Sequence, residues 1–140
     1  MSKAGEAVNR TVLVFSHLPQ VRDSIINAVG RRPAPDIGRL TFVEAETIAE
    51  VLAHLDAGTV DLAVLDGEAQ PTGGMGLCRQ VKHEITGCPP VIVAVRRQDD
   101  RWLATWSMAD AVLVQPLDPL TAAETVADVL RSSGVALLRG

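Results

Sequence analysis

The chain has 140 residues, of which 47% are hydrophobic and 21% charged, and its formal net charge is −4. This composition is typical of one globular domain and excludes a disordered chain. The 13 basic residues are scattered, which argues against a nucleic-acid partner. No apolar run approaches the roughly 20 residues of a membrane-spanning helix.

The ends of the chain differ in composition from its centre. The polar start has no apolar signal-peptide core, so we expect a cytoplasmic protein. We expect a flexible lead over residues 1–9, one domain over residues 10–131 and a tail over residues 132–140. Cys78 and Cys88 lack the spacing of a zinc site or a disulfide framework, so we expect one buried cysteine and one loop thiol.

Strand and helix patterns alternate in the first half. The predicted elements are, in chain order, a strand over residues 11–15, a helix from Pro19 to Gly30, a strand over 39–43 and a helix ending at Gly58. The apolar run of the first strand is rich in β-branched residues, and Pro19 suits a first helical position. Thr47 and Glu50 have the spacing of a capping box.

The second half continues this alternation. The predicted elements are a strand over 60–65, a helix marked by Leu77, Cys78, Val81 and Ile85, a strand over 89–95, a helix over 99–108, a strand over 111–114 and a helix after Asp118. We assign Leu120, Ala123, Ala127 and Leu130 to the apolar stripe of the last helix. The tail either extends that helix past Gly134 or forms a loose arm.

Strands this apolar need cover on both faces, which predicts a doubly wound α/β fold with five parallel strands and helices on both sides. Ligands of such sheets bind beyond the carboxyl ends of the strands. The residues at these ends are therefore the candidate site: Ser16, His17, Asp66, Val95, Arg96 and Gln115.

Three segments in order resemble the response-regulator receiver (CheY-like) family, over residues 10–130. They are TFVEAETIAEVLAHLDAGTVDLAVLD, GGMGLCRQVK and MADAVLVQPLDP. The resemblance implies the strand order 2-1-3-4-5, a signalling protein and not an enzyme, and Asp66 at the phosphoacceptor position of a two-component phosphorelay.

The other positions that carry the family's chemistry are changed. Ser16 and His17 align with the acidic pair that helps to bind Mg²⁺, Val95 with the Thr or Ser, and Gln115 with the Lys. Val112 aligns with the aromatic switch residue. Mg²⁺ prefers about six oxygen ligands, so we expect weak or absent Mg²⁺ binding and no other cofactor. Phosphoryl transfer depends on positioning and charge neutralisation, so unassisted phosphorylation should fail.

We therefore expect a degenerate, stand-alone receiver (a pseudo-receiver) that acts through protein contacts, largely without phosphorylation. The alternative is a phosphoprotein that a dedicated histidine kinase phosphorylates on Asp66. Asp66 is otherwise a solvated strand-end carboxylate that accepts hydrogen bonds from loop amides. A flavodoxin-like enzyme or nucleotide binder has the least support, because no GxGxxG or P-loop pattern follows a strand.

The face formed by helix four, strand five and helix five is the candidate interaction face. Trp102 and Trp106 lie four apart on the predicted fourth helix, and Val112 lies on strand five. Tryptophan is frequent in interface hot spots, so this face would contact a kinase, an output protein or a second copy; the alternative places the tryptophans in the core. Arg96 and Arg97 either hold an anion or are solvated. His17 either senses pH or is an exposed loop residue, with pairing to the nearby Asp66 as an option.

Overall fold

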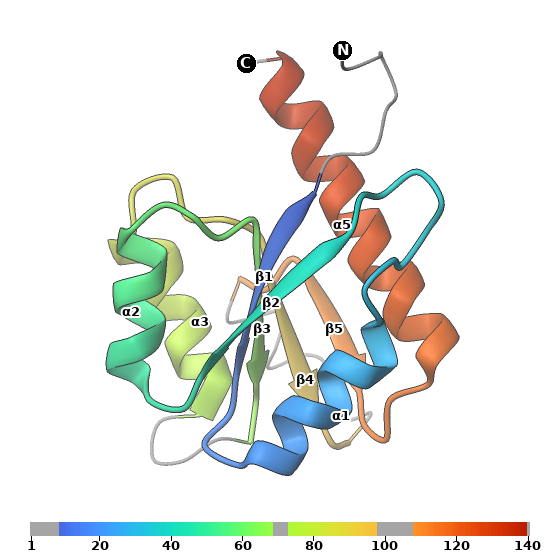
Figure 1. The fold of residues 1–140 in the computed structure, drawn as a ribbon. Helices are drawn as coiled ribbons and strands as arrows, with labels where there is room; N and C mark the ends of the chain where they lie inside the picture. Colours follow the sequence, from blue (N-terminus) through green and yellow to red (C-terminus); the bar gives the residue numbers. More distant parts are fainter. Residues whose placement is uncertain (1–8, 69–72, 98–107, 140) are drawn as a thin grey trace.

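The computed structural model describes residues 9–68, 73–97 and 108–139. In this part, five parallel strands form one sheet in the order β2-β1-β3-β4-β5, with helices on both faces (Figure 1). The strands are β1 (Arg10–Phe15), β2 (Leu40–Ala45), β3 (Leu62–Asp66), β4 (Val91–Val95) and β5 (Ala111–Val114). The helices are α1 (Pro19–Val29), α2 (Ile48–Asp56), α3 (Gly73–Glu84) and α5 (Pro119–Arg139). The predicted fold class and strand order are confirmed.

Several predicted strand bounds were wrong by one or two residues. The second strand is shifted and longer, over Leu40–Ala45, because its backbone pairs with all six residues of β1. The third strand begins later, at Leu62, and includes Asp66 as its last residue. The fourth begins at Val91, since the two preceding prolines have no amide hydrogen for a ladder.

The end of the third helix differs slightly from the predicted one, and most of the predicted fourth helix cannot be compared. Ile85 lies one residue beyond the end of α3. The predicted helix over 99–108 lies outside the described residues except for Met108, which is in a turn with a φ of 72°.

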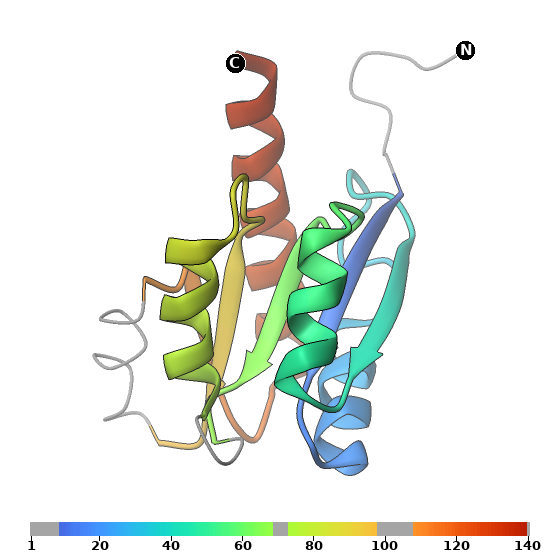
Figure 2. The same ribbon diagram turned by 90° about the vertical axis from the view of Figure 1, so that its left-hand side faces the viewer.

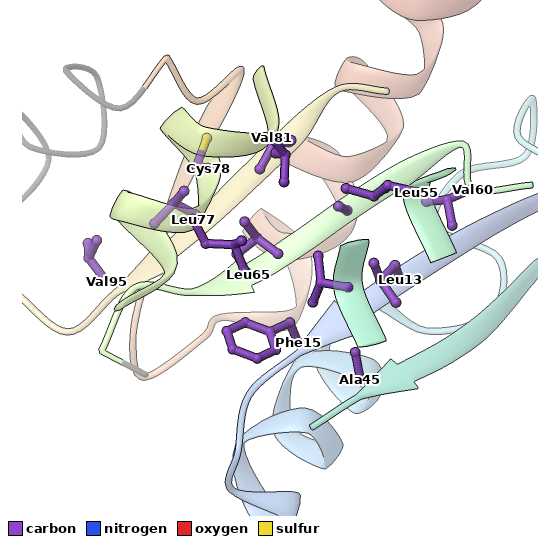
Figure 3. Packing of buried hydrophobic residues seen from close by; sticks show 14 residues of the cluster. Leu13, Phe15, Ala45, Leu55, Val60, Leu65, Leu77, Cys78, Val81 and Val95 are labelled. Atoms are coloured by element: carbon purple, nitrogen blue, oxygen red, sulfur yellow. The ribbon is translucent and has the colours of Figure 1, made fainter. Parts of the chain in front are cut away.

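Two apolar clusters fill the space between the sheet and its helices. In Figure 2, α2 and α3 cover one face of the sheet, while α1 and α5 lie behind it. Alternate residues of β1 point to opposite clusters, with Leu13 and Phe15 on the α2/α3 side and Val12 and Val14 on the other. Cys78 is fully buried in the α2/α3 cluster (Figure 3), as predicted. The strands are thus covered on both faces, which explains their continuous apolar sequences.

The buried stripe of α5 differs from the predicted one. Ala127 and Leu130 are buried as expected, but Leu120 is 69% exposed. Ala122 and Val126 occupy the sheet-facing positions instead. Since each residue turns the helix by about 100°, Leu120 points away from Ala122. The helix continues to Arg139 and extends beyond the starting ends of the strands (Figure 1), which settles the alternatives for the tail in favour of a helix.

Two side-chain caps fix the starts of helices. The predicted capping box at α2 is confirmed, with Thr47 Oγ1 accepting from the Glu50 amide at 3.2 Å. Hydrogen bonds from the backbone of Glu46 and Thr47 hold the pKa of Glu50 below its usual value. At α5, Asp118 accepts from the Thr121 amide at 2.9 Å, which likewise lowers the pKa of Asp118.

Two aspartates, Asp61 and Asp110, form paired hydrogen bonds with the neighbouring strand at the starting ends of β3 and β5. The Asp61 amide donates to the Thr11 carbonyl at 2.8 Å, and Asp61 Oδ2 accepts from the Thr11 amide at 2.7 Å. Asp110 repeats this pattern on Val91, with both distances 2.7 Å. Each carboxylate thus supplies an acceptor to the neighbouring strand just before its own strand begins.

None of the described helices is long and apolar enough to cross a lipid bilayer.

Candidate functional site

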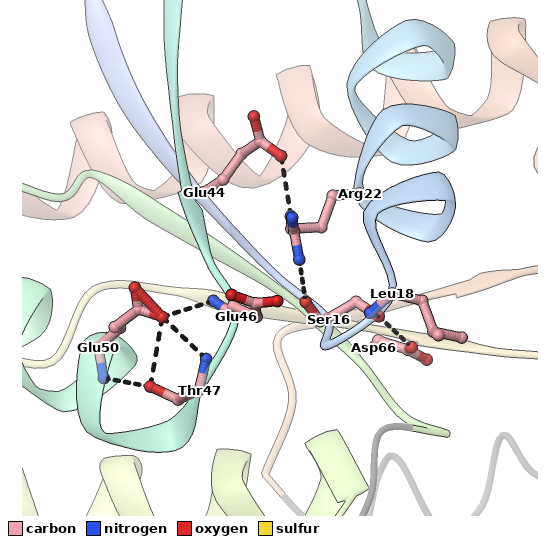
Figure 4. A network of polar contacts seen from close by, with 8 residues as sticks. All are labelled: Ser16, Leu18, Arg22, Glu44, Glu46, Thr47, Glu50 and Asp66. Carbon is pink, nitrogen blue, oxygen red and sulfur yellow. Dashed lines mark hydrogen bonds and ion pairs between the residues drawn. The ribbon is translucent and has the colours of Figure 1, made fainter.

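The carboxyl ends of β1 and β3 bring Ser16 and Asp66 together. Ser16 Oγ donates a hydrogen bond to Asp66 Oδ2 at 2.8 Å and accepts one from the Leu18 amide at 3.1 Å (Figure 4). Ser16 is fully buried. The first residue after β1 therefore has its hydroxyl engaged on both sides, as a donor to the carboxylate and as an acceptor for its own loop.

Asp66 is buried, with only 2% of its surface exposed. Its second oxygen, Oδ1, accepts from the Glu68 amide at 2.9 Å. The expectation of a solvated carboxylate was therefore wrong, although the loop-amide bond that it implied is present. Asp66 lies on a central strand, between β1 and β4, which shields it from water. Among the described residues, it forms no ion pair, so hydrogen bonds offset the cost of its burial.

Gly67 allows the chain to turn tightly after Asp66. Its amide donates to the Ala94 carbonyl at 2.7 Å. A Cβ atom at this position would lie 2.8 Å from the same oxygen and 3.1 Å from a methyl carbon of Val93. No side chain fits so close to β4, so glycine at this position sets the path of the loop that leaves Asp66.

Arg22 supports the site and was not identified from the sequence. Its Nη1 donates to the Ser16 carbonyl at 2.6 Å, and its Nε pairs with Glu44 at 2.8 Å (Figure 4). The arginine side chain is only 13% exposed. It joins α1, β2 and the loop after β1. Glu44 is 22 residues away in the sequence, and no local motif connects them, so only the fold reveals this contact.

The positions aligned with the family's hydroxyl and lysine residues lie next to each other. Val95 is fully buried in the α2/α3 cluster (Figure 3). The Gln115 amide donates to the Val95 carbonyl at 2.7 Å, and the Gln115 residue is half-buried. Val112 is half-buried against the same cluster as Val95. Both valines present only hydrocarbon here.

The remaining predicted site residues lie at the rim or beyond the described part. His17 is an exposed loop residue, as expected. It makes no hydrogen bond to Asp66, so the suggested pairing was wrong; Ser16 bonds to that carboxylate instead. Arg96 and Arg97 are exposed directly after β4. Trp102 and Trp106 lie outside the described residues.

The polar groups available at the site are few. Within residues 9–68, 73–97 and 108–139, no three His, Cys, Asp or Glu side chains lie close enough together to share a metal ion. The central pair consists of one carboxylate and one hydroxyl. Such a pair can fix the position of the carboxylate, but it adds no positive charge to neutralise a developing anion.

A groove of about 260 Å³ follows β5 and the first turn of α5. Its walls include Val112, Val114 and Leu117, and Asp118 and Thr121 lie at its polar side. The exposed Leu120 is on the same turn of α5. A second groove, of about 610 Å³, lies where β5 begins and includes Lys82 and Asp110 in its lining.

No family model matches the chain. Two curated relatives, both described as uncharacterized response regulatory proteins, come from Mycobacterium tuberculosis strains H37Rv and CDC 1551. Each is 46% identical over 121 residues, which cover 86% of this chain and 91% of the relative.

Solved structures share the fold at much lower identity. A CheY-like receiver domain protein from Methanospirillum hungatei has a TM-score of 0.71 at 17% identity, covering 92% of this chain and 99% of that one. The receiver domain of the Francisella response regulator 1452 has a TM-score of 0.72 at 18% identity, with coverage of 89% and 99%. At this identity, the likeness concerns the fold alone.

Proposed function

The chain belongs to the response-regulator receiver family, and we propose that it acts within that signalling family as a degenerate receiver. In this proposal the domain works as a protein–protein interaction module, largely without phosphorylation. Asp66 is then mainly a structural residue.

The hydrogen bond between Ser16 and Asp66 carries the proposal. The position where the family resemblance implies an acidic residue holds a hydroxyl instead, and that hydroxyl donates to the carboxylate at 2.8 Å. The other carboxylate oxygen accepts from a backbone amide. With both oxygens engaged and 2% of the residue exposed, a phosphoryl donor would have to displace existing contacts before reacting.

The donor set of the described residues does not suit Mg²⁺, the metal that the family implies. Mg²⁺ prefers octahedral coordination by oxygens, with charge from carboxylates. Only Asp66 provides a carboxylate at the Ser16 contact, and the imidazole of His17 suits softer metals. No step of the proposed function therefore depends on a bound metal.

The switch positions support the same conclusion. A phosphoryl group shifts a conformational equilibrium only through contacts that differ between the two states. Val95 has no hydrogen-bond donor in its side chain and is already fully buried. Gln115 has no charge, and Val112 is half-buried against the core. None of these side chains can form a charged contact with a phosphoryl group.

The proposed interaction face lies along β5 and α5. Its described part is the 260 Å³ groove containing Val112, next to the exposed Leu120. Trp102 and Trp106 are proposed to contribute to the same face. Its partner would be a histidine kinase, an output protein or a second copy of the chain.

Incubation with acetyl phosphate, with and without Mg²⁺, tests the chemistry. Intact-protein mass spectrometry of wild-type and Asp66→Asn protein should show no phosphoryl adduct in either. A receiver that carries the full acidic pair serves as the positive control. An adduct that requires both Mg²⁺ and Asp66 would contradict the proposal.

Sedimentation equilibrium tests the face for self-association. Leu120→Glu places a charge at an exposed position and should weaken association, whereas Gln20→Glu, at an exposed position of α1, should not. Treatment with acetyl phosphate should leave association unchanged. Equal behaviour of the two variants would remove the face from the proposal as a self-association surface.

The second candidate function is phosphorelay with a dedicated histidine kinase. It is favoured by the position of Asp66 at the carboxyl end of a central strand. A kinase could supply the positive charge that the described site lacks. Asp66→Asn would then abolish signalling in cells while leaving the protein folded, whereas the first proposal predicts a small effect.

A further inference from the structure

Four arginines that are scattered in the sequence gather at the end of the sheet where the strands begin. Arg10 starts β1, Arg39 directly precedes β2, and Arg31 and Arg32 follow α1. Backbone hydrogen bonds connect these segments: the Arg10 amide donates to the Arg39 carbonyl at 3.2 Å, and the Leu40 amide to the Arg31 carbonyl at 2.7 Å. We call Arg10, Arg31, Arg32 and Arg39 the arginine cluster.

The side chains of the arginine cluster are available to a partner. Arg31, Arg32 and Arg39 are exposed and Arg10 is half-buried. None of their guanidinium groups forms a hydrogen bond or an ion pair with another described residue. Of the nearby carboxylates, Asp36 is paired with Arg131, whereas Asp61 accepts from the uncharged Thr11 amide and keeps its single negative charge, which the four arginines outweigh. Positive charge is thus concentrated here, although the whole chain has a net charge of −4.

The loop that carries Arg31 and Arg32 is held in place. Ile37 is only 6% exposed and packs into the apolar cluster that contains Val12 and Val14, on the face of the sheet covered by α1 and α5. Asp36 and Arg131 form two hydrogen bonds of 2.6 Å, which connect the loop to α5. Figure 1 shows this segment beside α5. Because the backbone is already ordered, a partner would bind without the entropy cost of ordering the loop.

We propose that the arginine cluster binds a short acidic segment of a protein partner. Guanidinium groups match carboxylates with two parallel hydrogen bonds, and Asp36 with Arg131 forms such a pair within the same region. An extended polyanion would be longer than the arginine cluster and would also lie against the rest of the protein surface. That surface is net acidic and would repel it. A short run of Glu or Asp fits within the cluster.

This inference goes beyond the proposed function and can fail separately from it. The cluster lies where the strands begin, at the opposite end of the sheet from Asp66. Neither phosphorylation of Asp66 nor contacts along β5 are needed for it.

Fluorescence anisotropy of a fluorescein-labelled tetraglutamate peptide, short enough to stay within the cluster, tests the proposal. The comparison is between wild-type protein, Arg31→Glu/Arg32→Glu and the control Arg96→Glu/Arg97→Glu. Both double variants replace two adjacent exposed arginines, so they change the net charge equally. We expect about tenfold weaker binding for the cluster variant and less than about twofold for the control, with affinity falling as salt is raised. Circular dichroism confirms the fold, and Arg31→Gln/Arg32→Gln replaces the reversal variant if that one unfolds.

Three results would overturn the proposal. The first is equal loss of binding in both double variants, which indicates a general charge effect. The second is an absence of peptide binding even at about 50 mM salt, where surface electrostatics is strongest. The third is preferential, cluster-dependent binding of duplex DNA or of phosphatidylserine vesicles over the peptide, which would assign a different class of partner.

Discussion

Replacing Ser16 with alanine tests whether the hydroxyl holds Asp66 in place. The change removes the donor to Asp66 Oδ2 at 2.8 Å and the acceptor of the Leu18 amide at 3.1 Å. It leaves a carboxylate that is 2% exposed with only the Glu68 amide as a partner. The prediction is a marked loss of stability with no change of fold.

The expected loss follows from the two hydrogen bonds. A hydrogen bond to a charged group contributes roughly 1.5–3 kcal/mol, and a neutral one roughly 0.5–1.5 kcal/mol. The Leu18 amide is only partly buried, so water can replace most of its bond. We therefore expect the free energy of unfolding to fall by about 2–3 kcal/mol, a large part of the ~5–15 kcal/mol typical of a domain.

Urea unfolding followed by far-UV circular dichroism measures this loss. Ser24→Ala is the matched control, because Ser24 is exposed on α1 and its hydroxyl forms no bond to Asp66; its effect should stay within about 0.5 kcal/mol. Asp66→Asn and the double variant with Ser16→Ala complete a cycle, in which we expect a coupling energy of at least about 1 kcal/mol. Equal effects of the two Ser→Ala changes, or additive effects in the cycle, would refute the reasoning.

Three further predictions concern other parts of the structure. Gly67→Ala brings a Cβ to 2.8 Å from a backbone oxygen of β4 and should lower the free energy of unfolding, measured in urea, by about 1–3 kcal/mol. The control Gly58→Ala should cost less, because its Cβ meets nothing within 4 Å and only its φ of +74° is unfavourable. A larger loss for Gly58→Ala than for Gly67→Ala would contradict the predicted clash. Val95→Thr adds a hydroxyl at a fully buried site and should lower stability by roughly 1–3 kcal/mol without producing an acetyl phosphate adduct; an adduct would contradict the prediction. Arg131 lowers the pKa of Asp36 in the folded protein below its ordinary value of 3.8. The pair therefore stabilises the fold fully above about pH 4, and this stabilisation is lost as the pH falls through the pKa of Asp36 in the folded protein. The difference in urea midpoint between wild type and Arg131→Gln should therefore shrink from about pH 7 to about pH 3, and a constant difference would exclude this linkage.

Most of the fold could be predicted from local patterns. The apolar runs of β1, β3 and β4 are long enough to require cover on both faces, and the capping box at Thr47 and Glu50 fixes the start of α2. The apolar stripe of α5 was placed wrongly. Leu120 was chosen because leucine is hydrophobic, whereas the sheet contacts the smaller Ala122. In this helix, packing geometry outweighs hydrophobicity.

The site was predictable in position but not in its contacts. The carboxyl ends of the strands were correctly expected to bring Ser16 near Asp66. Burial of Asp66 could not be inferred, because a carboxylate at a strand end is usually solvated. Arg22, which contacts the Ser16 carbonyl, and the arginine cluster depend on residues far apart in the sequence, which only the folded chain brings together.

The aspartates that brace the starting ends of the strands bear on how the sheet avoids misaligned pairing. β5 has only four residues, and a slip by one residue would turn every side chain to the opposite face. Asp110 binds Val91 through both its amide and its carboxylate, a contact that a slipped strand would lose. Asp61 constrains β3 against β1 in the same way. Two short polar side chains thus select one alignment in a sheet whose long-range pairings form slowly.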